Sequence, residues 1–209
     1  RLTPLARGKY LMFSAPDGIF LSDVLKELTL FLNTHADAGA VCAKFYNENG
    51  TFHNRYKKFL SLFSIVFGGQ LYIGKHWAGK FYHRMLKLKE EPQQPVLIDQ
   101  CPHLAFLCRR EALHFPDVVD PNIASAACDY DMCKGVYERG YKIYLVPSAK
   151  IVHFRGVASG LWESDIAKER HILGTLHYFK KHHPWKFYPL KLIMVIDEFV
   201  LLMRNRTKR

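Results

Sequence analysis

The chain has 209 residues, of which 49% are hydrophobic and 23% are charged, so its composition excludes a disordered protein and suits one globular domain with a core. Lysine and arginine number 30 against 19 acids, which gives a net charge of +11. A field of that sign attracts the phosphates of nucleotides, lipid headgroups or nucleic acid, but a basic solvated surface without a dedicated partner explains the charge equally well.

The first residue and the cysteines add two expectations. The chain opens on Arg1 without a basic and then apolar leader, so we expect no signal peptide. Five cysteines, at positions 42, 101, 108, 128 and 133, form neither an even disulfide framework nor a paired C-x-x-C zinc pattern. Reduced thiols in the cytoplasm fit this pattern best.

The N-terminal third predicts a strand, a helix and a hairpin. The predicted elements are a strand at 9–13, a helix from Ser22 through Asn33, a strand at 38–45, and a tight turn at 47–50 that leads into a partner strand at 51–53. Asp17 lies in a turn just past the end of the first strand, and Ser22 can cap the helix.

The middle of the chain predicts shorter elements. An apolar, helix-like stretch at 57–67 precedes a loop at 68–93. Then come strands at 96–98 and 104–108, a short helix at 109–113, a helix at 129–139 stopped by Gly140, and strands at 142–146 and 150–154 separated by a turn at Pro147. Because strands and helices alternate, we predict an α/β fold with a mixed, mostly parallel sheet flanked by helices.

The C-terminal part predicts two helices, at 162–181 and 190–203. The second contains Asp197 and Glu198 and is too short and too charged to span a bilayer. Basic residues before and after it suggest a helix that lies on an anionic membrane surface. Docking of this helix on the protein's own core is an equal alternative. We therefore divide the chain into a main domain, 1–160, and a helical extension, 161–209.

Four segments stand out when taken together in chain order. They are Ala6-Arg7-Gly8-Lys9-Tyr10-Leu11-Met12-Phe13-Ser14-Ala15-Pro16-Asp17, then Leu107-Cys108-Arg109-Arg110-Glu111-Ala112-Leu113, then Asp129-Tyr130-Asp131-Met132-Cys133 with Gly140-Tyr141 and Val146-Pro147, and finally Val152-His153-Phe154 with Ser159. In this combination the chain resembles the nucleotide-sugar-dependent glycosyltransferases of family 2, particularly their rhamnosyltransferase-like bacterial branch.

This resemblance implies a GT-A-like fold, a nucleotide-sugar donor and a divalent cation, Mg²⁺ or Mn²⁺. It further implies transfer with inversion to a saccharide or lipid-linked acceptor in cell-envelope polysaccharide biosynthesis, in the cytoplasm or at the inner face of the plasma membrane. Members of the family begin with further strands that bind the nucleotide. The resemblance therefore also implies that an N-terminal nucleotide-binding portion is lacking here.

Each candidate residue has a chemical role that the resemblance implies. Asp17 and His153 match positions at the metal and the diphosphate, and a hard cation there stabilises the leaving diphosphate. Asp129 matches the catalytic base, which takes the proton of the acceptor hydroxyl. Asp131 and Arg155 are candidates for substrate binding. As alternatives, the two acids of 129–131 simply cap a helix, and the histidine is structural.

Three positions depart from the family pattern. Ala15 stands in place of an asparagine, Cys128 in place of a glutamate and His103 in place of a glycine. A competing interpretation is therefore a non-catalytic saccharide-binding or partner-binding module with a decayed or incomplete donor site. Nucleic-acid binding is a third interpretation, but the basic and aromatic residues of 53–84 carry no nucleic-acid motif, so we expect no nucleic-acid partner.

Overall fold

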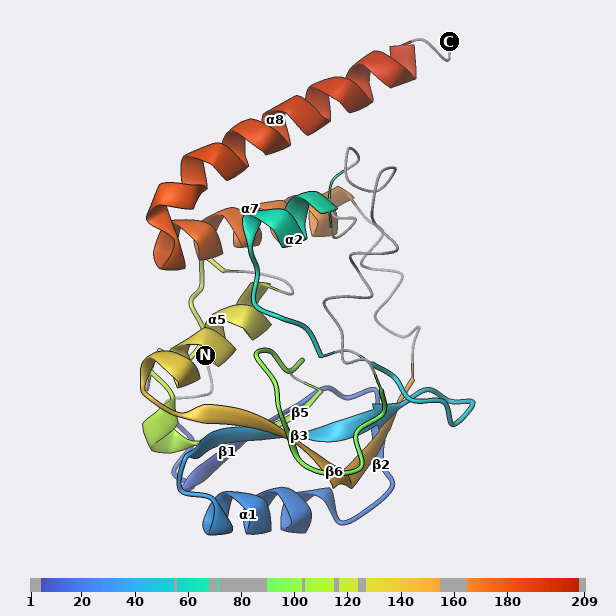
Figure 1. Ribbon diagram of the computed structural model, residues 1–209, viewed down its shortest axis with the longest axis vertical. Coiled ribbons are helices and arrows are strands. Elements are labelled where there is room, and N and C mark those ends of the chain that lie inside the picture. The colour runs from blue at the N-terminus through green and yellow to red at the C-terminus, as the bar shows by residue number, and fades with distance from the viewer. Residues whose placement is uncertain are drawn as a thin grey trace.

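The computed structural model describes residues 5–54, 56–67, 71, 90–102, 104–114, 117–123, 127–154 and 165–206. One sheet contains the strands β1 (Tyr10–Ser14), β2 (Gly18–Phe20), β3 (Ala38–Tyr46), β4 (Val96–Leu97), β5 (Ala105–Arg109) and β6 (Lys142–His153). The helices are α1 (Val24–Thr34), α2 (Leu62–Phe67), the 3₁₀ turn η2 (Arg110–Ala112), α5 (Ala127–Glu138), α7 (Asp165–His182) and α8 (Pro184–Arg206). Helix α1 covers one face of the sheet and α5 the other, with α7 and α8 beyond α5 (Figure 1).

The sheet is mixed but not mostly parallel, so that part of the prediction is wrong. Its order is β1-β5-β3-β6-β2, with β4 also beside β6. Only β3 and β6 pair in parallel, and the other pairings described are antiparallel. Strands β1, β3 and β6 do run in one direction, as alternating strands and helices predict. The short strands β2, β4 and β5 run the other way, and β5 lies between β1 and β3.

Strand β6 is one continuous strand rather than the two strands predicted. Its pairing with β3 passes from Ala43–Val146 directly to Lys44–Lys150, so residues 147–149 bulge out of the ladder. Proline has no N–H to give to a ladder, and a bulge is one of the places where a sheet accepts it. The hydroxyl of Ser148 donates to Glu27 at 2.7 Å, which ties this bulge to α1.

The two ends of α1 are held by long-range as well as local contacts. Asp23, not the predicted Ser22, caps the N-terminus, where its carboxylate accepts from the backbone N–H of Lys26 at 3.3 Å. Ser22 instead accepts from the backbone N–H of Lys150 at 3.0 Å. At the C-terminal end the buried guanidinium of Arg109 donates to the carbonyl of Leu32 and to that of Ala38 at 2.8 Å.

The two predicted glycine positions are confirmed. Gly50, in the tight turn after β3, has φ of +75°, and Gly140, directly after α5, has φ of +82°. Residues with a Cβ rarely adopt this left-handed region, so both glycines end their elements for a conformational reason. The return strand of the hairpin is reduced to a single bridge between Tyr46 and Phe52.

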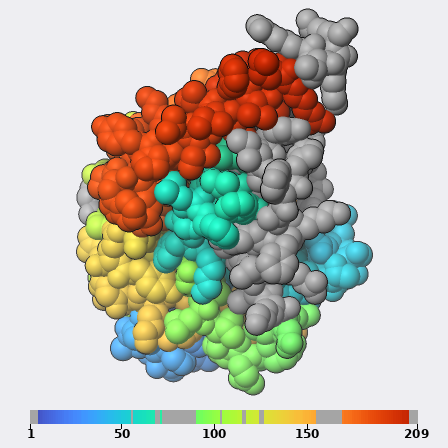
Figure 2. Space-filling model, turned by 45° about the horizontal axis from the view of Figure 1, so that its top comes forward, coloured from blue at the N-terminus to red at the C-terminus, as the bar shows by residue number. Residues whose placement is uncertain are grey.

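The helical layer has a hydrophobic core separate from that of the sheet. It contains Leu60, Ile65, Leu71, Ile123, Ala127, Tyr130, Tyr178, Phe179 and Leu190, contributed mainly by α2, α5, α7 and α8. Figure 2 shows α8 as an outer layer of the molecule beside α2. The helix predicted at 57–67 is thus shortened to α2, and most of the loop predicted at 68–93 lies outside the described residues.

All five cysteines are free, as predicted. Cys42, Cys101, Cys108 and Cys133 are buried, whereas Cys128 is only half-buried. Burial raises the pKa of the Cys101, Cys108 and Cys133 thiols well above the ordinary value, so these side chains behave as small apolar groups of the core.

Candidate functional site

Asp17 and His153 meet where β2 pairs with the end of β6. The register places Gly18 opposite His153, and the backbone N–H of Phe154 donates to the carbonyl of Asp17 at 2.9 Å. As a result, His153 Nε2 lies 3.2 Å from Asp17 Oδ2, with side chains only 8% and 13% exposed. Two residues that are 136 positions apart in sequence, and that the resemblance assigns to one metal site, are therefore in direct contact.

His53, which was not predicted as a site residue, joins this pair. Its ring stacks on that of His153 with centroids 5.4 Å apart and planes inclined by 18°. The backbone N–H of His53 donates to the carbonyl of Phe45 at 2.8 Å, which brings it back to the end of β3 beside β6. In the sequence this residue belongs to the return of the predicted hairpin and begins the basic and aromatic stretch 53–84, and neither pattern assigns it to a site.

The donor set at Asp17 and His153 fits a divalent cation that takes its other ligands from phosphate or water. Asp17 Oδ1 is buried and has no hydrogen-bond partner among the described residues. A carboxylate and an imidazole suit Mn²⁺, and Mg²⁺ is commonly held by one or two carboxylates plus substrate phosphates. No group of three or more metal-ligating side chains occurs in the described part of the chain, so the described side chains supply two ligands at most.

A buried lysine lies at the same end of β3 and β6. Lys44, opposite Lys150 in the sheet, is 3% exposed and forms an ion pair with Glu91 at 2.8 Å, and the hydroxyl of Tyr46 donates to the same carboxylate oxygen at 2.7 Å. Burial lowers the pKa of Lys44, but the hydrogen bonds and negative charge of Glu91 and Tyr46 together outweigh it and leave the pKa raised. The charge of Lys44 is therefore retained near the ends of these strands, where parallel α/β sheets bind ligands.

Asp129 lies in the first turn of α5, on the sheet face opposite α1 (Figure 1). It is half-buried, and its Oδ1 is 3.8 Å from the thiol of Cys128. Burial, together with the negative charge of Asp129, raises the pKa of Cys128 to about 12. The Asp129 carboxylate thus lies beside the Cys128 thiol at the start of α5. Asp17 and His153 contact each other elsewhere, where β2 pairs with the end of β6.

Asp131 joins α5 to α7. Its carboxylate, 5% exposed, is 2.7 Å from His182 Nε2 and 2.9 Å from Lys181 Nζ. Burial raises the pKa of Asp131, but the hydrogen bonds from His182 and Lys181 outweigh it, so the pKa is lowered. In this arrangement Asp131 orients two basic side chains.

A small pocket of about 30 Å³ opens beside this cluster. Its lining includes Asp131, Gly135, Glu138, Lys181 and His182. That volume holds one or two water molecules and is too small for a sugar ring. Neither Asp17 nor Asp129 borders this pocket, which lies between α5, α7 and residues 113–114 and 117–118.

The remaining candidates divide into residues that lie outside the described part and residues with structural contacts. Arg155, predicted to bind substrate, lies outside the described residues, as do His103 and Ser159. Arg109 and Arg110, which carry part of the resemblance, donate to backbone carbonyls. Both arginines therefore have a structural role, because they hold distant backbone segments of the domain together.

Comparison with solved structures finds distant neighbours, among them A197 from STIV and GalNAc-T7. No protein-family model matches the chain, and no curated protein matches it. A197 from STIV is 14% identical with a TM-score of 0.43, over 71% of this chain and 59% of A197. GalNAc-T7, crystallised with UDP, GalNAc and Mn²⁺, is 10% identical with a TM-score of 0.45, over 86% of this chain and 41% of GalNAc-T7. The chain spans less than two thirds of either protein, and similarity of this degree identifies neither a family nor an activity.

Proposed function

We propose that the chain is a glycosyltransferase, or part of one, that transfers a sugar from a nucleoside-diphosphate donor to a saccharide or lipid-linked acceptor with inversion. The observation that carries this proposal is the 3.2 Å contact between Asp17 and His153. The resemblance to family 2 assigns these same two residues to one metal site, and nothing in their separation along the chain requires them to meet.

The leaving group explains the chemistry expected at this pair. Cleavage of the donor leaves a diphosphate with a growing negative charge, and a divalent cation held by Asp17 and His153 would stabilise that charge. The net charge of +11 favours the approach of such an anionic donor. Arg155, two residues beyond His153, is proposed to contact the diphosphate oxygens.

Asp129 is proposed as the general base. A carboxylate within hydrogen-bond reach of the acceptor hydroxyl takes its proton as the oxygen attacks the anomeric carbon. One displacement without a protein nucleophile inverts the configuration at that carbon. Asp131 would support this base by holding Lys181 and His182 against the same helix.

The finer assignments follow the resemblance alone. They are a rhamnosyltransferase-like member of family 2, a role in cell-envelope polysaccharide biosynthesis, and a cytoplasmic place at the inner face of the plasma membrane.

The test separates donor binding from transfer. The protein is titrated with UDP and dTDP in the presence and absence of Mn²⁺ and, separately, incubated with the corresponding nucleotide sugars and an acceptor panel while the released UDP or dTDP is measured. We expect Asp17→Asn to abolish Mn²⁺-dependent binding. We expect Asp129→Asn to keep that binding but lower transfer by about 10²-fold or more.

Asp37→Asn is the matched control, because Asp37 is an exposed acid that pairs with Lys142. It should change neither readout. Nucleotide binding that does not depend on Mn²⁺ or on Asp17, or full transfer by Asp129→Asn, would refute the proposal. Saccharide binding without any turnover would instead favour the non-catalytic module, which the two-ligand donor set and the replacement residues Ala15 and Cys128 also suit.

A further inference from the structure

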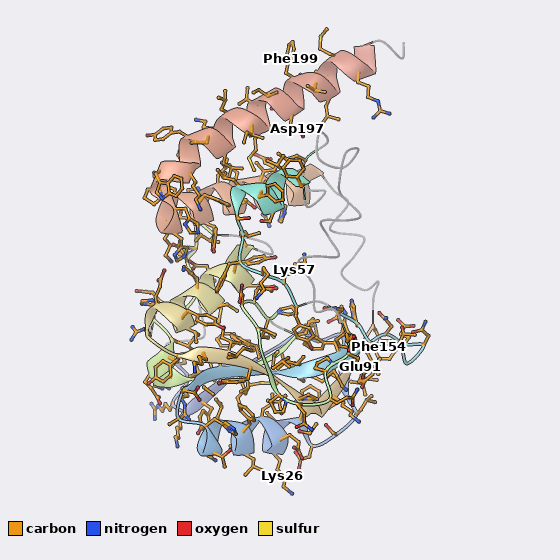
Figure 3. All side chains as sticks on the ribbon, in the orientation of Figure 1. Lys26, Lys57, Glu91, Phe154, Asp197 and Phe199 are labelled. Atoms are coloured by element: carbon orange, nitrogen blue, oxygen red, sulfur yellow. The ribbon has the colours of Figure 1, made fainter. Side chains whose placement is uncertain are left out.

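Helix α8 carries a continuous apolar stripe on its exposed side. Its residues are Trp185, Tyr188, Leu192, Val195, Ile196, Phe199, Leu202 and Met203, each between 46% and 75% exposed. They recur at intervals of one, three or four positions, which places them on one face of a helix. Figure 3 shows Phe199 on the outer side of α8, away from the rest of the protein.

The opposite face of α8 is attached to the protein. Leu190 is fully buried in the core of the helical layer, where Ile193 and Met194 also pack. Asp197 is only 6% exposed and lies on the side of the helix that faces the body in Figure 3. The exposed stripe therefore belongs to a docked helix whose inner face is satisfied, and a second apolar face remains in water.

Basic side chains lie near both ends of the stripe, and two of its own members are aromatic, Trp185 and Tyr188. Lys186 and Lys191 lie near its start, and the ammonium of Lys186 is 4.6 Å from the centroid of the Trp185 ring. Arg204 lies at its end, and Glu198 is the exposed acid along this helix. Trp and Tyr with neighbouring lysines are typical of the boundary between lipid headgroups and acyl chains.

We propose that α8 binds the surface of an anionic lipid bilayer, lying in its plane with the apolar stripe among the acyl chains and the basic residues at the headgroups. Within the described residues no helix is long and apolar enough to cross a membrane, so the contact is peripheral. Charge complementarity favours this partner over a second copy, because two chains of charge +11 repel each other while an anionic bilayer attracts each of them. This inference agrees with the place at the membrane given under the proposed function, but it does not depend on glycosyltransferase activity.

Vesicle sedimentation tests it with the whole chain. We expect binding to vesicles of phosphatidylglycerol and phosphatidylcholine in equal parts, and much weaker binding to phosphatidylcholine alone. The double variant Leu192→Glu with Phe199→Glu should lower the partition coefficient at least about tenfold. Lys186→Glu with Lys191→Glu should lower it on the anionic vesicles only, and added salt should have the same effect.

The matched control is Leu25→Glu with Leu30→Glu, two equally exposed leucines of α1 at 50% and 57%. It should bind vesicles like the unchanged protein, and circular dichroism should show all variants folded. Equal binding by the stripe variant and the control would overturn the proposal. So would concentration-dependent dimerisation in the absence of vesicles that the stripe variant alone abolishes, because the stripe would then belong to a second copy.

Discussion

At the scale of single residues, the contact between α5 and α7 depends on one imidazole between two carboxylates. His182 Nε2 is 2.7 Å from Asp131, and its Nδ1 is 3.1 Å from Glu138. An imidazole that carries a proton on both nitrogens donates to both acids, whereas a neutral ring donates to one. The ammonium of Lys181 also pairs with Asp131, so this buried carboxylate is stabilised as an anion.

The lowered pKa of Asp131 predicts a loss of stability in acid. A carboxyl group whose pKa is lower in the folded state contributes stability above its unfolded value of 3.8, and this contribution is lost as the pH falls through the folded-state value. Urea titrations should therefore show the free energy of unfolding falling below about pH 4. Asp131→Asn should lower it by about 1–3 kcal/mol at pH 7 and flatten its acid dependence.

Asp37→Asn is the comparison for this experiment. Asp37 also has a lowered pKa, caused first by its hydrogen bond from Lys142, but the pair is exposed. Surface pairs contribute about 0–1 kcal/mol, so this variant should change stability less. If Asp131→Asn left the fall of the free energy of unfolding in acid unchanged, other carboxylates would be its cause.

At the scale of elements, α1 is fixed to the sheet by the side chain of Arg109 from β5. Its guanidinium donates to carbonyls at and just beyond the C-terminal end of the helix, those of Leu32, His35 and Ala38. Carbonyls in the last turn of a helix have no partner within the helix. The guanidinium of Arg109, from β5, supplies this partner. Because it also donates to the carbonyl of Ala38, it fixes the start of β3 relative to α1.

Arg109→Met should therefore destabilise the protein strongly. The substitution keeps most of the apolar volume but leaves buried carbonyls without a donor, and we expect a loss of about 2–4 kcal/mol in the free energy of unfolding. Arg110→Met is the control, since Arg110 is less buried and donates to Gly8 and Ala6 in the N-terminal segment. Chemical denaturation should separate the two variants, and equal losses would contradict this assignment.

At the scale of the whole molecule, the sheet and the helical layer are stabilised by different cores. The sheet core combines β1, β3, β5 and β6 with α1 and with the part of α5 from Met132 onward. The second core joins α2, α7 and α8 to the first turn of α5. Helix α5 contributes to both cores through Met132 and Tyr130. The contact of α5 with α7 therefore couples the stability of the two layers.

Leu190→Ala tests the second core. Leu190 is fully buried, so its truncation should cost about 2–4 kcal/mol and lower the melting temperature. Leu192→Ala is the matched control on the same helix, because Leu192 is 62% exposed and should change the free energy of unfolding by less than about 0.5 kcal/mol. Thermal unfolding followed by circular dichroism distinguishes them, and a small effect of Leu190→Ala would show that α8 is not needed for this layer.

Local patterns predicted most elements, but not how they pair. The strands β1 and β3, the helices α1 and α5 and the stop at Gly140 follow from apolar spacing and turn residues. The insertion of β5 between β1 and β3 depends on contacts between distant segments, which no local period encodes.

The candidate site divides in the same way. Motif order anticipated that Asp17 and His153 belong together. The stacking of His53, and the partners of Asp131 about fifty positions further along the chain, depend on tertiary packing and were not visible in the sequence.

The buried thiols give the folded protein a built-in reporter. Alkylating reagents such as iodoacetamide attack the thiolate, and a thiol that is both enclosed and hard to ionise reacts only when the structure around it opens. Cys42, Cys101, Cys108 and Cys133 lie inside, while Cys128 is partly accessible at the start of α5. All five thiols should therefore label slowly near neutral pH, Cys128 because its raised pKa leaves little thiolate and the other four because they are enclosed. Mass spectrometry of the labelled chain would then measure how often the structure around the four buried thiols opens.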